Sequence, residues 1–389
     1  MATTKVSGEL VDLNESTSES GLKIPTGTNN NRPVTELAGM IRNNTNETSD
    51  GSASCEEYYN GAAWKKLNNI PFPVYFRTVI YTGNGGTNPI TGVGFKPDLV
   101  WAKKRSGADD NVLFDSTRGV QKELVSNSTA AEATKSSAIS SFDADGFTTG
   151  NNGALNANGS TYVAWCWKAN GGTTSSNTDG NITSTVQTDA AAGFSIVQFT
   201  NSSPGSSTTV GHGLGSTPDM ILLKRTDGIE DWYVYHTSMG QGEAMRLNQT
   251  GGQAAATNLF NPVNATVFNP SFTGASGQVL IAYCFKNITG YSKFGSYTGD
   301  ATAGQAIPTG FKPTWVLLKS TVGNDNWRVY DSTRGFTAGG FLEPNTNDAE
   351  DTTGAPQIAV SDTGFSITSG GVTQGLNANG NLVTYWAFK

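Results

Sequence analysis

The sequence predicts an all-β protein in which an N-terminal arm with a small hairpin motif precedes three tandem β-sandwich modules of jelly-roll-like type. Three observations lead to this prediction. Glycine supplies 47 of the 389 residues, which is typical of a chain with many turns. Short apolar runs of strand length are bounded by Gly, Asn and Asp. A set of sequence phrases also occurs three times, which indicates a repeated structural unit.

The repeat is defined by three phrases. The first occupies 96–100, 217–221 and 312–316, with a proline second in each copy. An aromatic residue 17 positions after each proline opens the second phrase, at 114–119, 235–240 and 330–335. The third phrase closes each unit, at 164–168, 282–286 and 385–389. Because the spacing of the first two phrases is identical in every unit while the spacing between units varies, we expect tandem modules that each have their own core.

Domain boundaries follow from composition. Residues 1–70 are rich in polar residues and predict a weakly structured arm, in which 39–43 and 57–67 are short strands and Asn60-Gly61 forms a hairpin turn. The Gly, Ser and Thr content of 171–192 predicts a linker. The expected modules are residues 71–170, 193–289 and 290–389.

Strands inside a module are best seen in the first copy. Residues 99–103 and 112–114 are apolar on nearly every position and are separated by a polar turn. The closing segment 162–167 is apolar on both alternating faces. This pattern favours a central strand of a two-layer sandwich over an exposed edge strand.

Charge and hydropathy exclude several classes of partner. The formal net charge is -7 and the basic residues are scattered, so the sequence offers no basic stripe for nucleic acid. No apolar run approaches the roughly 20 residues that span a bilayer, and we expect no membrane insertion. Residues 1–13 lack the apolar stretch of a signal peptide, which predicts folding in a cytoplasm.

Catalytic and metal-binding residues are scarce, and we expect no enzyme, no cofactor and no metal. Cys166 and Cys284 occupy the same position of two modules and are interpreted as small buried apolar residues. His236 stands where the sister modules have aspartate. Asp143 and Asp145 lie close to Gly146, as acidic residues do in calcium-binding loops, but a β-turn capped by aspartate is favoured because further oxygen ligands are missing.

Six residues form the tentative binding set. Asp115 with Arg118, and Asp331 with Arg334, belong to the Asp-Ser-Thr-Arg-Gly phrase, whose groups can bind sugar hydroxyls or a partner carboxylate. The structural reading is favoured over this one: the aspartate bonds the next turn, arginine pairs with it and glycine takes positive φ. Trp232 and Trp327 occupy equivalent places and are candidates for stacking on a ligand, although packing at the strand entry is favoured.

The repeat resembles sequences of structural proteins of tailed bacteriophages, particularly tail fibres and other virion appendages. The resemblance involves 94–101, 114–119, 156–168 and 290–299. Residues 32–43 and 57–64 resemble a hairpin motif common near the start of phage fibre proteins. The resemblance implies location on a virion assembled in the host cytoplasm, with homotrimeric assembly as its usual companion.

These observations lead to the expectation of a non-enzymatic virion protein, a tail fibre or receptor-binding appendage that mediates host attachment. The arm would dock to other virion structural proteins or to copies of itself, and the modules would bind a host-surface glycan or protein with avidity. One alternative is a capsid decoration or baseplate protein. Another is a fibre-borne polysaccharide-degrading enzyme, which needs two carboxylates about 5 to 10 Å apart.

Overall fold

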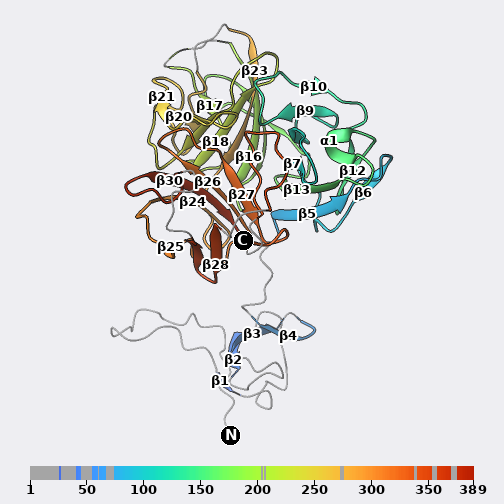
Figure 1. Ribbon diagram of the computed structural model, residues 1–389, viewed down its shortest axis with the longest axis vertical. Coiled ribbons are helices and arrows are strands. Elements are labelled where there is room, and N and C mark those ends of the chain that lie inside the picture. Colours follow the sequence, from blue (N-terminus) through green and yellow to red (C-terminus); the bar gives the residue numbers. More distant parts are fainter. Residues whose placement is uncertain are drawn as a thin grey trace, which may run out of the picture. The chain divides into compact units, whose positions relative to one another are not determined.

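The computed structural model describes residues 26–27, 41–44, 55–59, 61–66 and 74–389, the last range without 203–204, 206, 272–275, 337–339, 353–356 and 369–374. The chain divides into two compact units, Met1–Pro73 and Val74–Lys389. Both units consist of antiparallel sheets apart from one short parallel pair and a single described helix, so the all-β prediction is confirmed. Figure 1 shows the strands of the second unit in sequence colours.

The N-terminal unit holds one four-stranded sheet. Its strands are β1 (Thr26–Gly27), β2 (Ile41–Asn44), β3 (Cys55–Tyr59) and β4 (Trp64–Lys66), in that spatial order. β3 and β4 form a hairpin in which Tyr59 lies opposite Trp64. Gly61 in the turn has a φ of 95°, a left-handed conformation that suits glycine. The predicted hairpin after residue 57 is therefore present, and β2 overlaps the predicted strand at 39–43. The polar runs of the predicted arm at 14–20 and 28–33 lie outside the described residues.

Module 1 is a sandwich of a large and a small sheet. The large sheet runs β10-β9-β8-β7-β13-β5, and the small one runs β11-β12-β6. The elements are β5 (Phe76–Thr82), β6 (Asn88–Ile90), β7 (Leu99–Lys104), β8 (Asn111–Asp115), β9 (Lys122–Val125), β10 (Ala133–Thr134), β11 (Ile139–Asp143), β12 (Gly146–Thr149), α1 (Gly153–Asn156) and β13 (Thr161–Trp167).

Module 2 repeats this plan with an extended main sheet, in the order β14-β15-β16-β23-β18-β19-β20-β21, and a small second sheet of β17 and β22. Its strands are β14 (Ser175–Asn177), β15 (Ser184–Asp189), β16 (Phe194–Asn201), β17 (Val210–Gly211), β18 (Met220–Arg225), β19 (Tyr233–His236), β20 (Glu243–Arg246), β21 (Ala254–Ala255), β22 (Val267–Phe268) and β23 (Gln278–Phe285).

Module 3 has a four-stranded main sheet, β24-β30-β26-β27, and a three-stranded second sheet, β25-β29-β28. Its strands are β24 (Ser292–Thr298), β25 (Gln305–Pro308), β26 (Trp315–Ser320), β27 (Arg328–Asp331), β28 (Ile358–Ser361), β29 (Gly364–Ile367) and β30 (Leu382–Phe388). In all three modules the closing strand (β13, β23 or β30) lies between two corresponding strands: β5, β16 or β24 on one side, and β7, β18 or β26, which follows the proline phrase, on the other.

Each main sheet is buried on both faces, for two different reasons. One face packs on the module's own small sheet and forms a separate core, represented by Phe147 in module 1, Phe268 in module 2 and Phe365 in module 3. The other face joins a single core shared by all three modules. This arrangement explains why the closing strands are apolar at nearly every position, since alternate side chains enter two cores.

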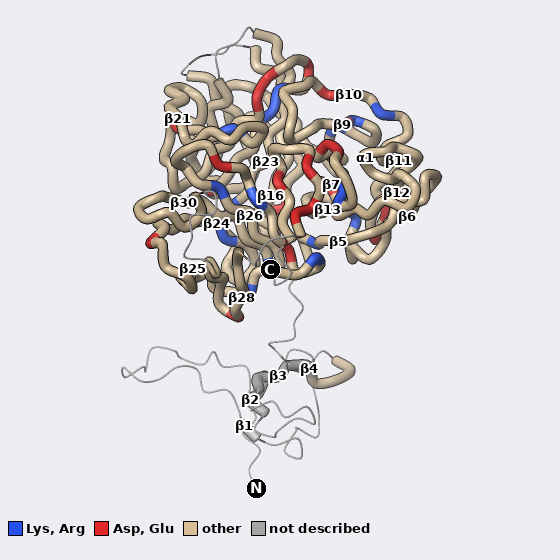
Figure 2. Tube along the Cα trace, viewed as in Figure 1, with Lys and Arg blue, Asp and Glu red and all other residues tan. Residues whose placement is uncertain are grey.

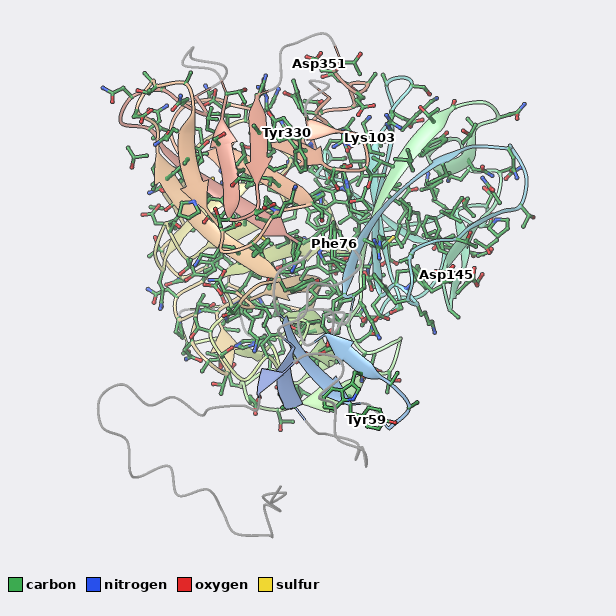
Figure 3. The ribbon with its side chains drawn as sticks, turned by 90° about the horizontal axis from the view of Figure 1, so that it is seen from below. Tyr59, Phe76, Lys103, Asp145, Tyr330 and Asp351 are labelled. Atoms are coloured by element: carbon green, nitrogen blue, oxygen red, sulfur yellow. The ribbon has the colours of Figure 1, made fainter. Side chains whose placement is uncertain are left out.

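Aromatic rings hold the shared core together. Trp167 of module 1 lies 5.9 Å from Trp315 of module 3 and 6.1 Å from Phe285 of module 2, measured between ring centroids. Phe76 and Phe388 are stacked at 4.9 Å. Figure 3 places Phe76 where ribbons of the three modules meet. Burying an apolar side chain of this size stabilises the fold by roughly 1.5 to 3 kcal/mol, so the modules form one body rather than separate domains.

The predicted linker 171–192 has a different structure from that expected. It contains β14 and β15, and β15 pairs with β16 along six residues, from Ser184 opposite Phe199 to Asp189 opposite Phe194. The segment is poor in large apolar residues, but its backbone completes the ladder of module 2. Main-chain hydrogen bonding therefore orders a segment whose side chains alone predict flexibility.

Candidate functional site

The three modules close into a ring through three contacts of the same kind, which we call seams 1–2, 2–3 and 3–1. Each seam joins the strand after a module's proline phrase to a loop of the preceding module: 125–129 of module 1, 246–250 of module 2, or 343–347 of module 3. In seam 3–1 module 3 supplies the loop and module 1 the strand, so the last module contacts the first. The repeated phrases lie at these seams.

A buried lysine fastens each seam. Each amine donates to the carbonyl oxygen six residues onward in its own module and to a carbonyl of the preceding module. Lys319 bonds Asp325 at 2.7 Å and Thr250 at 2.7 Å. Burial lowers the pKa of each amine to about 8. Figure 3 shows Lys103 between modules 1 and 3. The three lysines are Lys103, Lys224 and Lys319.

The two tryptophans of the tentative binding set are seam residues. Trp232 is fully buried, and its Nε1 donates to Val125 O of module 1 at 2.8 Å. Trp327 is fully buried, and its Nε1 donates to Arg246 O of module 2 at 3.0 Å. In module 1 the same place holds Asn111, whose Nδ2 donates to Thr346 O of module 3 at 2.6 Å.

The Asp-Ser-Thr-Arg-Gly phrase has the structural role that its residue types favour. Asp115 accepts from the backbone N–H of Arg118 at 2.8 Å and from Arg118 Nε at 2.5 Å. Gly119 has a φ of 100°, a conformation that residues with a Cβ rarely adopt. Burial disfavours the charged form of Arg118, but the attraction of Asp115 and Glu132 outweighs it and raises the pKa of the guanidinium.

Module 3 repeats these contacts closely. Asp331 accepts from the backbone N–H of Arg334 at 2.9 Å and from its Nε at 2.5 Å, and Arg334 Nη1 donates to Glu350 at 2.9 Å. Both aspartates also bind the closing strand of the next module in the ring. Tyr283 Oη donates to Asp115 at 2.7 Å, and Trp165 Nε1 donates to Asp331 at 3.1 Å.

Module 2 lacks the charges of this arrangement. His236 replaces the aspartate, Met239 the arginine and Gln253 the glutamate. Buried His236 accepts from Ser238 N–H through Nδ1, and its Nε2 lies 3.4 Å from Tyr385 O of module 3. Burial lowers the pKa of His236 to about 4. Trp386, which corresponds to Trp165 and Tyr283, has a buried Nε1 that finds no acceptor in the described part of the chain.

All six side chains of the tentative binding set are therefore buried, so none of them is placed to contact a ligand at the surface of this body. The side chains of Asp115, Asp331 and Arg334 are 0% exposed and that of Arg118 is 1% exposed. A sequence pattern shows which residue types recur but not which face of the unit meets another copy.

The remaining polar candidates also have structural contacts. Asp145 accepts from the backbone N–H groups of Gly92 and Gly94, which lowers its pKa, and Asp143 accepts from Thr148 Oγ1. The turn at 144–145 between β11 and β12 agrees with the predicted capped turn. In the described ranges, no group of three or more His, Cys, Asp or Glu side chains is placed to hold a metal ion.

Both module cysteines lie in apolar cores, as predicted. Cys166 and Cys284 are fully buried and free, and burial raises the pKa of each thiol well above its usual value. A thiol held in its neutral form is a poor nucleophile.

Among the residues that the structure describes, no helix has the length and hydrophobicity of a bilayer span.

The accessible candidates are apolar residues in turns, which the sequence analysis did not select. Ile229 is 76% exposed between β18 and β19, and Val322 is 51% exposed between β26 and β27. These are corresponding connections of modules 2 and 3. The signal that could have found them is an isolated aliphatic residue within a polar, glycine-containing turn. Figure 2 shows acidic and basic residues interspersed over the body, without a stripe of one sign.

Comparison with known proteins gives one match. Residues 73–389 match the family model described as "Domain of unknown function (DUF7483)". The match begins one residue before the second compact unit and covers all three modules. No curated protein and no solved structure matches the chain. The family boundary thus agrees with treating the three modules as one body.

Proposed function

Since the chain belongs to this family of unknown function, we propose its role from the structure: a non-enzymatic phage virion protein, a tail fibre or receptor-binding appendage that attaches to the host surface. The observation that carries the proposal is the use of the repeated polar phrases inside the seams. Their charged groups bind one another and the next module, so the repeat builds a rigid body with turns at its surface.

Three further features support this proposal. The repeats and the hairpin motif resemble those of phage appendage proteins. The N-terminal unit is a compact unit separate from the family-defining body, as expected of an arm that docks to other virion proteins or to further copies. The body places similar turns at similar positions of its modules, and such repetition raises avidity for a repeated host glycan or protein. Homotrimeric assembly belongs to the same proposal.

We propose Ile229 and Val322 as receptor contacts in place of the buried set. Both are exposed aliphatic side chains, and burying each against a receptor removes apolar surface from water. The test replaces both with serine and measures adsorption of particles or of the purified protein to host cells. We expect adsorption to fall at least about tenfold, because each lost contact contributes roughly 1 kcal/mol or more.

The matched control is Val120→Ser, which changes an exposed aliphatic residue of module 1 directly after the second phrase, 114–119. We expect this control to adsorb like the unchanged protein. Equal adsorption of the double variant and the control would reject the two residues as contacts. Antibody labelling of particles tests location separately, and the absence of label from virions would reject the virion assignment itself.

Capsid decoration is a second candidate, and one observation favours it. The three modules complete their ring within one chain, so the body needs no second chain to close its shared core. The mass of the purified protein in solution separates the candidates: a trimer supports a fibre, and a monomer favours decoration.

A fibre-borne polysaccharide-degrading enzyme is the third candidate. Its test is host-polysaccharide digestion by the unchanged protein and by variants with asparagine at Asp143 and Asp145.

A further inference from the structure

The outer edge of β5 carries backbone groups that point away from its neighbour. β5 pairs with β13 alone, Lys168 N–H donates to Tyr75 O, and Gly83 N–H donates to Ser160 O. In an antiparallel ladder, alternate residues bond the same partner strand, so Phe76, Thr78 and Ile80 direct their N–H and C=O groups to the other side. The described part of the chain supplies no hydrogen bond to these groups.

The corresponding edge of module 2 is occupied by a strand of the chain itself. Lys286 N–H donates to Gly193 O as Lys168 N–H does to Tyr75 O, so Phe194, Ile196 and Gln198 correspond to Phe76, Thr78 and Ile80. These three residues lie opposite residues 189, 187 and 185 of β15. Module 2 therefore shows which kind of ligand this edge accepts, namely an antiparallel extended strand.

One side chain of β15 also bonds the neighbouring module. Gln187, opposite Ile196, is fully buried, and its Nε2 donates to Ser116 Oγ and to Thr117 Oγ1, both at 2.9 Å. Its Oε1 accepts from Gly172 N–H at 2.6 Å. β15 thus spans seam 1–2: its backbone bonds module 2, and a carboxamide bonds the phrase loop of module 1.

At seam 3–1 the corresponding surfaces are the outer edge of β5 and the loop that contains Ser332 and Thr333. No described strand lies between them. Ser332 and Thr333 correspond to Ser116 and Thr117, are exposed, and make no side-chain hydrogen bond with other described residues. On β5, the buried Thr78 Oγ1 has no partner in the described ranges, and Ile80 is 45% exposed. A strand added at this edge would lie beside Thr78, and its side chain would then offer the hydroxyl a hydrogen-bond partner.

Seam 2–3 differs from both. There the edge of β24 is closed by its own module, because Phe294 N–H donates to Asn287 Oδ1 at 2.7 Å and Ile288 N–H donates to Ser292 O at 3.2 Å. The three equivalent edges thus consist of one filled by β15, one closed locally and one open. Of these three equivalent edges, that of β5 is therefore the one at which another strand can pair.

We propose that the outer edge of β5, together with Ser332 and Thr333, binds an extended strand of a partner protein by β-addition. The bound strand runs antiparallel to β5 and presents a glutamine or asparagine opposite Thr78, whose carboxamide bonds Ser332 and Thr333 as Gln187 bonds their counterparts. Backbone bonds supply affinity and the carboxamide supplies register and specificity. This inference goes beyond the proposed function and does not depend on it.

The test uses the full chain and a fluorescent peptide with the sequence of residues 183–190, which contains Gln187. We expect saturable binding by fluorescence anisotropy and slower hydrogen exchange at the amides of Phe76, Thr78 and Ile80. A peptide with leucine in place of glutamine, and the variant Ser332→Ala with Thr333→Val, should each bind about tenfold more weakly, since each loses hydrogen bonds to the carboxamide.

Ile80→Pro removes an outward N–H without touching the β13 ladder, so it should also weaken binding at least about tenfold. The matched control is Thr237→Val, which alters the corresponding phrase position at the closed seam and should bind like the unchanged protein. No saturable binding at about 1 mM peptide, or exchange protection confined to residues outside β5, would overturn the proposal. Equal binding by the Ser332/Thr333 variant would also overturn it.

Discussion

Seams 3–1 and 2–3 join the modules by the same geometry with different chemistry. At seam 3–1, Asp331 binds both Arg334 and the indole N–H of Trp165. At seam 2–3, neutral His236 stands in the place of the aspartate, and the indole N–H of Trp386 has no acceptor in the described structure. The backbone and the lysine contacts are nevertheless alike at both seams.

The difference shows that the charged groups act as a set. Module 2 lacks the aspartate, the arginine and the glutamate together, so neither charge of the buried pair is left uncompensated. Replacing a buried ion pair by neutral packing is often close to neutral for stability, whereas removing one partner is costly. The shared aromatic core and the buried lysines therefore hold the ring, and the ionic set contributes mainly to the register of two seams.

The largest expected effect comes from removing a seam tryptophan. Trp327→Ala leaves a large cavity in the shared core and frees Arg246 O, so the free energy of unfolding should fall by about 3 to 5 kcal/mol. Asn111→Ala, at the corresponding place of seam 3–1, should cost only about 1 to 2 kcal/mol because it removes hydrogen bonds alone. Urea unfolding measures both, and equal losses would show that the two seams do not differ in packing.

Breaking the ionic set at one member should come next. Arg334→Met leaves the Asp331 carboxylate buried without its cation, so the free energy of unfolding should fall by about 3 kcal/mol. The backbone N–H of residue 334 and Trp165 Nε1 still donate to the carboxylate in this variant. Met239→Leu is the matched change in module 2 and should cost less than about 1.5 kcal/mol. Similar losses for both variants in urea unfolding would contradict the view that the charges act as a set.

Restoring the set in module 2 tests the comparison in the opposite direction. His236→Asp alone buries a carboxylate without a cation and should destabilise the protein by about 2 kcal/mol or more, although Trp386 gains an acceptor. Adding Met239→Arg and Gln253→Glu should recover most of this loss. A triple variant no more stable than the single variant would show that the seam 2–3 site does not accept the ionic geometry of its neighbours.

Acid sensitivity should separate the same variants. The folded state holds the pKa of His236 at about 4, below its usual value of 6.5, so the unfolded chain binds the proton first as pH falls. Stability should therefore decline between about pH 6.5 and 4 by a component that is lost in the triple variant. An unchanged pH profile in the triple variant would exclude His236 as its source.

The sequence predicts the fold class and the repeat well because both depend on local signals. Continuous apolar runs, turn glycines and the phrase spacing determine strands such as β7 and β13 without reference to other modules. The capped turn of the Asp-Ser-Thr-Arg-Gly phrase is also local, since Asp115 bonds residues within the same phrase. These features were therefore accessible from residue types and spacing.

The candidate site could not be predicted because it depends on contacts between residues far apart in the sequence. The indole N–H of Trp232 donates to a carbonyl oxygen 107 positions earlier in the chain, and that of Trp165 donates to an aspartate 166 positions later. An aromatic beside polar residues at a strand entry has the same appearance in sequence whether it faces solvent or another module. The strands of 171–192 were missed for a related reason, since backbone pairing leaves little trace in composition.

The last expected effect, spread over all seams, is a rise in stability at alkaline pH. The pKa of Lys103, Lys224 and Lys319 is about 8 in the folded state and about 10.5 in the unfolded chain, so the unfolded chain binds more protons between these values. Stability should increase with pH in this window, by at most about 1.4 kcal/mol per pH unit for each lysine. The neutral amine retains two N–H donors for its two carbonyl partners, so the seams stay closed.

Above about pH 10 the trend reverses, because burial raises the pKa of tyrosines such as Tyr283 and Tyr330. Urea unfolding from pH 7 to 10 measures the slope, and Lys319→Met should reduce it by about one third if the three seams contribute equally; an unchanged slope would assign the alkaline gain to other groups.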